Sequence, residues 1–106
     1  MLFVSGAAGG VGLTAVEIGK RLGARVIASA RGAEKLAIAR EAGADEVIDS
    51  DAADLKDRLK AMGGVDVVYD AVGGPVFDAA LRATRPDGRV LAIGFASGQV
   101  PQVAAN

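Results

Sequence analysis

The chain has 106 residues, 51% of them hydrophobic and 24% charged, with 12 basic and 13 acidic residues and a net charge of −1 at pH 7. This length suits one domain, and the balanced charge gives no sign of a nucleic acid or an anionic membrane as a partner. The chain has no cysteine and no histidine, which excludes disulfides, imidazole acid–base catalysis and a zinc site of the Cys/His type within it.

The chain begins with a short apolar run that leads into a segment of helical periodicity. Residues 2–4 are apolar and are closed by Ser5-Gly6, which predicts a buried strand. Apolar side chains then recur at spacings of four, three and four, which predicts a helix that ends at Gly23. These side chains are Val11, Ala15, Ile18 and Leu22.

The rest of the chain continues this alternation of strand and helix. Further strands are predicted at residues 25–29, 46–49, 65–69 and 89–93. Helices are predicted at residues 34–42 and 51–62 and from Pro75 to Thr84, with a turn at Arg85-Pro86-Asp87-Gly88. The expected inner faces of the last two helices are Leu55, Leu59 and Met62, and Phe77, Leu81 and Thr84. No clear element follows Gly98.

This element order predicts the fold class. Strands joined by helices run parallel, and right-handed crossovers place helices on both faces of the sheet. Nearly continuous apolar strands fit a sheet that is covered on both sides. The sequence therefore predicts an α/β fold, a doubly wound parallel (Rossmann) sheet of five strands in the order 3-2-1-4-5, with one dinucleotide-binding domain over residues 1–106.

The connection between the first strand and the first helix is rich in glycine. Residues 7–12 read as a dinucleotide-binding turn in which alanine replaces the first glycine. Gly9 would let the backbone approach a pyrophosphate, and Gly12 would let the helix pack closely on the strand. Gly10 and Val11 would offer free N–H groups at the positive end of the helix. The alternative is a tight connection that binds nothing.

The end of the second strand bears on the choice of cofactor. About 20 residues after the glycine turn, enzymes that use NAD usually carry Asp or Glu to bind the ribose hydroxyls. The present chain has Ser29-Ala30-Arg31-Gly32 there, without an acid. Arg31 and Lys35 could form charge-assisted bonds to a 2′-phosphate, so the sequence predicts NADP(H). The alternative is that both are solvated charges.

Glycine also follows the fourth and fifth predicted strands, at residues 69–74 and 93–98. In a sheet of order 3-2-1-4-5, the carboxyl ends of strands one, four and five line the same crevice. We therefore expect these two connections to flank the nicotinamide half of the cofactor.

Together these segments resemble the cofactor domain of medium-chain dehydrogenases/reductases, specifically the zinc-free NADPH:quinone oxidoreductase branch. The motifs are GAAGGVG at 6–12, GARVIA at 23–28, EKLAIAREAGADEVID at 34–49, GVDVVYDAVGG at 64–74 and GRVLAIGFASG at 88–98. The resemblance implies a six-stranded nucleotide-binding domain inserted into a GroES-like catalytic domain. We therefore expect the chain to be a fragment that lacks the catalytic domain and the sixth strand.

The resemblance also implies an activity and a set of cofactor-binding residues. Members of this branch use NADPH to reduce quinones, or the double bond of enones and enoyl thioesters. The positions matching the family contact the pyrophosphate through Ala8, Gly9, Gly10, Val11 and Gly12, the 2′-phosphate through Arg31 and Lys35 next to Ala30, and the nicotinamide with its ribose through Ala71, Val72, Gly73, Gly94, Phe95, Ala96 and Ser97. No catalytic residue and no metal ligand is predicted.

One position departs from the family pattern. Many relatives have Asn-Tyr after the third strand, where this chain has Asp49-Ser50, so Asp49 is expected to be a mild obstacle to a 2′-phosphate. Since hydride transfer is the chemistry of the cofactor and this chain supplies one wall of the site, we expect weak NADP(H) binding and little turnover by the chain alone. The parent protein is expected to be an oxidoreductase.

Other functions also use a glycine-rich turn of this kind. A nucleotide triphosphatase loop is excluded, because Leu13-Thr14 stands where its lysine and hydroxyl are required. The short-chain dehydrogenase/reductase turn also matches, but that family needs Tyr-x-x-x-Lys, and the only tyrosine, Tyr69, is followed four residues later by Gly73. A nucleotide-sensing module without catalysis and an enoyl-thioester reductase domain remain open alternatives.

The sequence also bears on the partners and the location of the protein. No apolar run approaches the roughly 20 residues of a membrane span, and we expect a cytoplasmic protein. The expected partner is a small quinone or enone in the parent enzyme, with no nucleic acid or membrane. An unpaired edge at the fifth strand predicts a homodimer through that edge, as the resemblance also implies.

Overall fold

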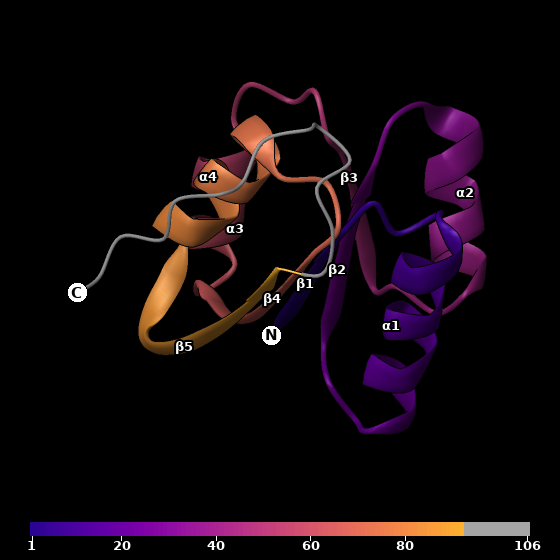
Figure 1. The fold of residues 1–106 in the computed structure, drawn as a ribbon, viewed down its shortest axis with the longest axis horizontal. Helices are drawn as coiled ribbons and strands as arrows, with labels where there is room; N and C mark the ends of the chain where they lie inside the picture. The colour runs from indigo at the N-terminus through magenta and orange to yellow at the C-terminus, as the bar shows by residue number, and fades with distance from the viewer. Residues whose placement is uncertain (93–106) are drawn as a thin grey trace.

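Five parallel strands and four helices alternate along residues 1–92, the part of the chain that the computed structural model describes (Figure 1). The strands are β1 (Leu2–Ser5), β2 (Val26–Ala30), β3 (Glu46–Asp49), β4 (Val65–Asp70) and β5 (Thr84–Ala92). The helices are α1 (Gly10–Arg21), α2 (Ala33–Glu41), α3 (Leu55–Ala61) and α4 (Gly74–Arg82). The strand order β3-β2-β1-β4-β5 confirms the predicted doubly wound α/β fold. None of these helices, all within residues 1–92, has the length and apolar character that crossing a membrane requires.

The sheet is covered by a pair of helices on each face. Helices α1 and α2 lie on one side of the sheet, and α3 and α4 lie on the other (Figure 1). Successive side chains of a strand point to opposite faces, so in β1 Phe3 packs with the cluster under α3 and α4, and Val4 packs with the cluster under α1 and α2. All five residues of β2 are buried, as expected for a strand covered on both faces.

The register brings the carboxyl ends of the central strands together. Ser5 of β1 pairs with Ser29 of β2, and Val4 of β1 pairs with Tyr69 of β4. The connections that follow β1, β2 and β4 therefore leave the sheet side by side, at one edge. This arrangement positions the candidate site.

Helix α1 packs on the sheet through a different face from the one that carries the apolar residues by which the helix was predicted. The sheet-facing residues are Gly12, Val16 and Gly19, all buried, whereas Val11, Ile18 and Leu22 are exposed. The helix lies so close to the sheet that a Cβ on Gly19 would come within 2.7 Å of Leu2 Cδ2. Close approach requires small residues on the contact side, so the larger apolar side chains lie on the free side.

Strand β5 begins earlier than the sequence predicted. Thr84 pairs with Val65, and the ladder resumes where Arg89 pairs with Val67. The predicted turn at residues 85–88 is therefore an irregularity within the strand instead of its beginning. A bulge lets extra residues leave the ladder while pairing continues on both sides of it. Residue 93, predicted to end this strand, lies outside the described residues.

Two helices differ from their predicted bounds or faces. Helix α3 starts at Leu55 instead of residue 51, and it buries Leu55 and Leu59 as predicted. Helix α4 buries Val76, Phe77 and Ala80, whereas Leu81 of the predicted face is only partly buried and Thr84 already belongs to β5. Phe77 is common to the predicted and observed faces, and the helix is rotated so that its smaller residues also meet the sheet.

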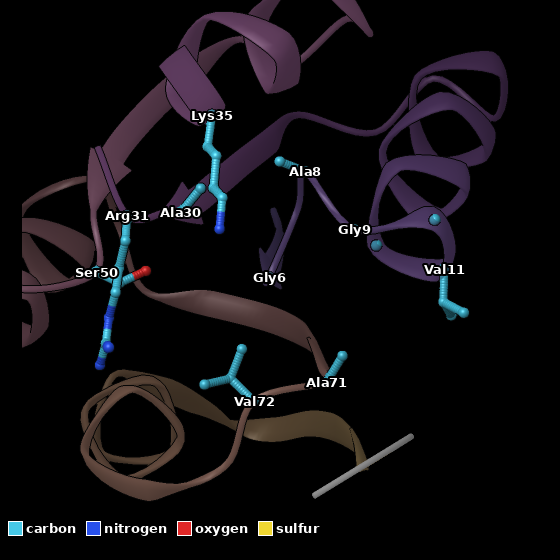
Figure 2. A pocket seen from close by; sticks show the side chains of 12 residues that line it. Gly6, Ala8, Gly9, Val11, Ala30, Arg31, Lys35, Ser50, Ala71 and Val72 are labelled. Atoms are coloured by element: carbon cyan, nitrogen blue, oxygen red, sulfur yellow. The ribbon is translucent and has the colours of Figure 1, made fainter. Parts of the chain in front are cut away.

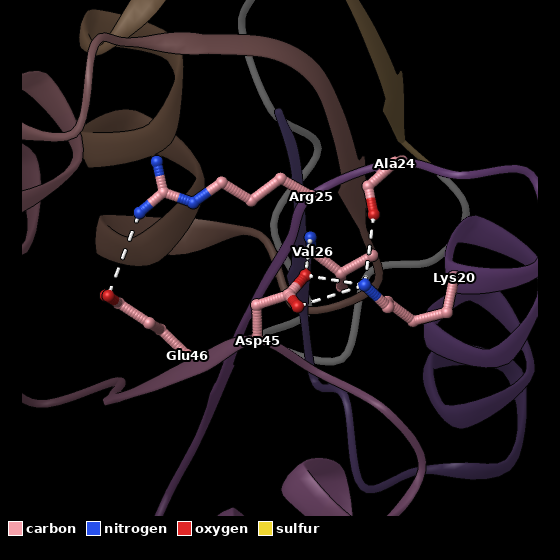
Figure 3. A network of polar contacts seen from close by, with 6 residues as sticks. All are labelled: Lys20, Ala24, Arg25, Val26, Asp45 and Glu46. Carbon is pink, nitrogen blue, oxygen red and sulfur yellow. Dashed lines mark hydrogen bonds and ion pairs between the residues drawn. The ribbon is translucent and has the colours of Figure 1, made fainter.

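A polar network ties together the amino-terminal ends of β2 and β3 (Figure 3). Asp45 accepts hydrogen bonds from the Val26 backbone N–H at 2.8 Å and from Lys20 Nζ at 2.9 Å, and Arg25 pairs with Glu46 at 3.7 Å. The hydrogen bond from the Val26 N–H is the main reason that the pKa of the Asp45 carboxyl lies below its ordinary value, and the hydrogen bond from Lys20 lowers this pKa further. This network connects the end of α1 to two strands.

Candidate functional site

A cavity of about 570 Å³ opens at the carboxyl edge of the sheet, within the range of roughly 300–1,000 Å³ typical of small-molecule and cofactor sites. Figure 2 shows the lining residues around it, at the ends of β1, β2, β3 and β4 and in the first turns of α1 and α2. The residues that line it are Gly6, Ala8, Gly9, Gly10, Val11, Gly12, Ala30, Arg31, Lys35, Ser50, Ala71 and Val72.

The turn between β1 and α1 presents free backbone donors to this cavity. Gly6 has a φ of 63°, and its carbonyl accepts the Gly9 N–H at 3.0 Å. Helix α1 then starts at Gly10 without a side-chain cap. The first N–H groups of a helix, here those of residues 10–12, have no acceptor within it, and the helix dipole makes this end positive. The geometry suits an anion.

The glycines of this turn differ in what an added side chain would meet. A Cβ on Gly12 would lie 2.2 Å from the Gly6 carbonyl oxygen, so the fold itself requires glycine there. This confirms the close packing predicted for Gly12. A Cβ on Gly9 would make only an ordinary 3.4 Å contact, and one on Gly10 would meet nothing within 4 Å. The described protein does not fill the space beside Gly9 and Gly10, which leaves it open to a ligand.

Cationic side chains stand at the end of the cavity next to β2. Arg31 and Lys35 both line it, with Ala30 and Ser50 beside them (Figure 2). Arg31 Nε also pairs with Asp51 Oδ1 at 3.3 Å, and both side chains are about two-thirds exposed, at 68% and 70%. The sequence interpretation missed this ion pair.

Asp49, the expected obstacle, is not among the residues that line the cavity. Its carboxylate accepts the backbone N–H groups of Asp51 at 2.9 Å and Gly32 at 3.4 Å. The carboxylate thus holds the turn between β3 and α3 against the one between β2 and α2.

The connection after β4 contributes a third side of the cavity. Ala71 and Val72 line it, but Gly73 does not. Gly73 is buried, and its N–H donates to Asp70 Oδ2 at 2.8 Å. Its backbone donor is therefore already used inside the protein, and its place beside the cofactor stays a prediction. The predicted residues Gly94, Phe95, Ala96 and Ser97 lie outside the described residues.

Two lining residues were absent from the predicted set. Gly6 was interpreted only as the end of the first strand, although its positive φ carries the turn that opens the cavity. Ser50 was noted only as a departure from the family pattern, and its proximity to Arg31 follows from the pairing of β3 with β2. Gly6 could have been predicted from its position beside the glycine turn, whereas no local pattern indicated Ser50.

The titratable side chains of β4, Asp66, Tyr69 and Asp70, do not line the cavity. Asp66 interacts with Arg85 at 3.6 Å, near the opposite edge of the sheet, and Asp70 is fully buried. Within residues 1–92, no cluster of three or more acidic side chains could hold a metal ion. The chemical resources of the described cavity are backbone donors, two cations and one hydroxyl.

Comparison with known proteins adds a family to this geometry. Residues 10–106 match the family model described as zinc-binding dehydrogenase. The quinone oxidoreductase-like protein 2 homolog of Nematostella vectensis is 39% identical over 109 aligned residues, which cover 99% of this chain and 30% of that protein. The chain thus spans less than a third of the length of this relative.

Solved structures agree with the match. A mycobacterial quinone oxidoreductase is 40% identical with a TM-score of 0.88, over 97% of this chain and 33% of the other. The quinone oxidoreductase of Escherichia coli, solved in complex with NADPH, is 38% identical with a TM-score of 0.86, over 97% of this chain and 32% of the other. Both share its parallel sheet and flanking helices.

Proposed function

The chain belongs to the zinc-binding dehydrogenase family, and from this premise we propose that it binds NADP(H) in the cavity at the carboxyl edge of its sheet. Membership confirms the resemblance to the cofactor domain of medium-chain dehydrogenases/reductases. The observation that carries the proposal is one cavity with the open positive end of α1 and two cations, Arg31 and Lys35, along its walls. The NADPH in the E. coli structure supports it.

The residues present fit such a cofactor. A pyrophosphate would accept hydrogen bonds from the N–H groups of residues 10–12, with Ala8 and Gly9 close beside it. Glycine at positions 9 and 10 leaves room that no described side chain uses, as a closely approaching ligand requires. Ala71 and Val72 would face the part of the cofactor beyond the pyrophosphate. The outer residues Gly73, Gly94, Phe95, Ala96 and Ser97 remain predictions.

The proposed 2′-phosphate site is formed by Arg31 and Lys35. An exposed ion pair contributes roughly 0–1 kcal/mol, so the contact of Arg31 with Asp51 is weak enough to be exchanged for a better partner. A phosphate carries about two negative charges and strong acceptors. Arg31 would therefore turn to the phosphate when the cofactor is bound, and Lys35 would add a second charge-assisted bond.

The proposed reaction is that of the longer protein. NADPH supplies a hydride when bound, and this chain binds and orients it while shielding one side from water. We propose a quinone or an enone as the acceptor, with an enoyl thioester as the alternative. Because the chain spans about a third of its relatives, we expect it to bind cofactor but not to turn over alone. Hydride transfer without zinc is tested by assaying the longer protein with and without a chelator.

Parallel titration with NADPH and NADH tests the cofactor assignment. We expect NADPH to bind the 106-residue chain about tenfold more tightly, since charge-assisted bonds contribute roughly 1.5–3 kcal/mol and 1.4 kcal/mol is tenfold. Lys35→Ala should remove most of this preference and leave NADH binding unchanged. Arg21→Ala is the matched control, because Arg21 is an exposed cation in the last turn of α1, far from the helix end at the cavity. Equal binding of the two cofactors would refute the 2′-phosphate assignment.

Self-association and location remain proposals. Within residues 1–92, β5 is an edge strand of the sheet, and its Leu91 is half exposed. An edge with unpaired backbone groups favours pairing with a second copy, which supports the expected homodimer. Sedimentation at increasing concentration would detect it, and a strictly monomeric chain would argue against it. The cytoplasm is proposed as the compartment, to be checked by cell fractionation.

A further inference from the structure

The sheet face under α3 and α4 changes from apolar to polar at its carboxyl edge. Phe3 of β1 pairs with Ile27 of β2 and Val68 of β4, and all three are buried in one apolar cluster. Two residues further along the same strands, on the same face, stand Ser5, Ser29 and Asp70. These are the only polar side chains that are fully buried within residues 1–92.

Two of these side chains are hydrogen-bonded to the connection after β4. Ser5 Oγ donates to Asp70 Oδ1 at 2.5 Å and accepts the Ala71 N–H at 3.2 Å. Asp70 Oδ2 accepts the Gly73 N–H at 2.8 Å. The bonds thus hold both ends of residues 71–73, the segment that carries the lining residue Val72.

The core does not require this arrangement. Asp70 is fully buried, and it forms no ion pair with any cation of residues 1–92. Burying a carboxylate without a cation is costly, and an apolar side chain of similar volume often stabilises a core at least as well. Val68 occupies the corresponding inner position two residues earlier. The role of the carboxylate therefore lies in the contacts that it makes.

Those contacts fix a wall of the cavity. A Cβ on Gly6 would lie 3.0 Å from Val72 Cγ2, so residues 71–73 rest against the turn that carries the pyrophosphate donors. Across the sheet, β1 lies between β2 and β4. A cofactor with its 2′-phosphate at the end of β2 and its pyrophosphate at the end of β1 has its remaining half on the side of β4.

We propose that Asp70, held by Ser5, is a positioning residue that sets residues 71–73 for the nicotinamide half of the cofactor. The inference rests on the proposed binding of NADP(H). It assigns Asp70 no contact with the cofactor, because Asp70 does not line the cavity. Its effect passes through the backbone N–H of Gly73 and through Ser5.

Two ligands separate positioning from folding. NADPH spans the whole cavity, whereas adenosine 2′,5′-bisphosphate has only the adenosine end with its phosphates. Asp70→Leu removes both acceptors and places two methyl groups where the two carboxylate oxygens stand. We expect it to raise the dissociation constant of NADPH about tenfold, as for the loss of one well-placed hydrogen bond, and that of the bisphosphate by less than about twofold. Asp70→Asn, which keeps one acceptor for Gly73, should restore most NADPH binding.

Ser29→Ala is the matched control. Ser29 is buried in the same row, but its hydroxyl has no hydrogen-bond partner within residues 1–92, so both dissociation constants should stay within about twofold. Amide hydrogen exchange gives a readout that does not depend on ligands. The Ala71 and Gly73 amides should exchange faster in Asp70→Leu, while β1 and β2 keep their protection. If Asp70→Leu does not fold, Asp70→Asn and Ser5→Ala are compared in the same way.

Each outcome bears on the proposal. Selective loss of NADPH binding with faster exchange at residues 71–73 supports it. Unchanged NADPH binding in the folded Asp70 variants, or an equal loss of both ligands, overturns the positioning role and leaves the proposed function intact. Failure of the unmodified chain to bind either ligand overturns the proposed function and this inference with it.

Discussion

The two edges of the parallel sheet differ in how they use charge and glycine. At the edge formed by the amino-terminal ends of the strands, Asp45 accepts hydrogen bonds from Lys20 and from the Val26 N–H (Figure 3). The opposite charges of Asp45 and Lys20 therefore neutralise each other there. At the carboxyl edge, Arg31 and Lys35 face a cavity, and the first donors of α1 have no side-chain cap (Figure 2).

This difference separates what holds the fold from what is available to a ligand. The amino-terminal edge satisfies its polar groups internally, as a structural region should. The carboxyl edge leaves backbone donors and positive charge beside open space, which is costly for stability but useful for binding an anion. The variants below test whether the two edges divide these roles.

Gly12→Val should have the largest effect, because it breaks the carboxyl edge where the fold depends on it. Its Cβ would meet the backbone oxygen of Gly6 at 2.2 Å, and neither backbone can yield easily. We expect a loss of about 3 kcal/mol or more in the free energy of unfolding and no measurable NADPH binding. Urea denaturation measures the first and fluorescence titration the second.

Gly10→Ala is its control, since a Cβ there meets nothing within 4 Å and its free energy of unfolding should change by less than about 1 kcal/mol. A Gly12→Val chain as stable as the parent would show that α1 can move away from the turn, and the steric reason for this glycine would be wrong.

Gly9→Ala should weaken binding without breaking the fold. Gly9 has a φ of −76°, which alanine adopts without strain, and loss of glycine at this cap costs less than about 1 kcal/mol. The added methyl group would stand where the pyrophosphate approaches, so we expect the NADPH dissociation constant to rise about tenfold. Calorimetric titration measures it, with thermal unfolding in parallel. Unchanged NADPH affinity would mean that no ligand uses the space beside Gly9.

Asp45→Asn should have the smallest effect, confined to stability. The site is partly exposed, so after allowing for solvent screening we expect a loss of about 1 kcal/mol at neutral pH and unchanged NADPH binding. Asp87→Asn is the control, since Asp87 is exposed and its carboxylate makes no hydrogen bond or ion pair within residues 1–92. Urea denaturation of the three chains measures the differences.

The pH dependence of that loss follows from the lowered pKa of Asp45. A carboxyl with a lowered pKa in the folded state stabilises the fold fully above its unfolded pKa of about 3.9. The contribution is lost as the pH falls through the lower folded value. The difference between Asp45→Asn and the parent should therefore be complete at pH 7 and shrink in acid. A difference that is the same at pH 7 and in acid would show that the charge of Asp45 is not its cause.

Much of the fold could be predicted because its signals are local. Residues 46–49 were predicted as a strand and form β3. The first two helices were predicted to end at Gly23 and at residue 42, and Gly23 and Gly43 both have positive φ. The face that a helix turns to the sheet is a different matter. The stripe from Val11 to Leu22 has helical spacing, yet the smaller residues Gly12 and Gly19 meet the sheet, because the distance between the layers sets which side chains fit.

The sequence by itself determined the alternation of strands and helices, the glycine turn and the pair of cations after β2, because each depends on residues close together in the chain. Tertiary structure alone decided which groups meet across strands. Ser5 and Asp70 are 65 residues apart, and no local sequence pattern predicts their hydrogen bond. The same holds for Ser50 beside Arg31 and for Gly73, whose donor turns inward to Asp70. The pairing register of the strands brings these residues into contact, and that register forms only when the sheet assembles.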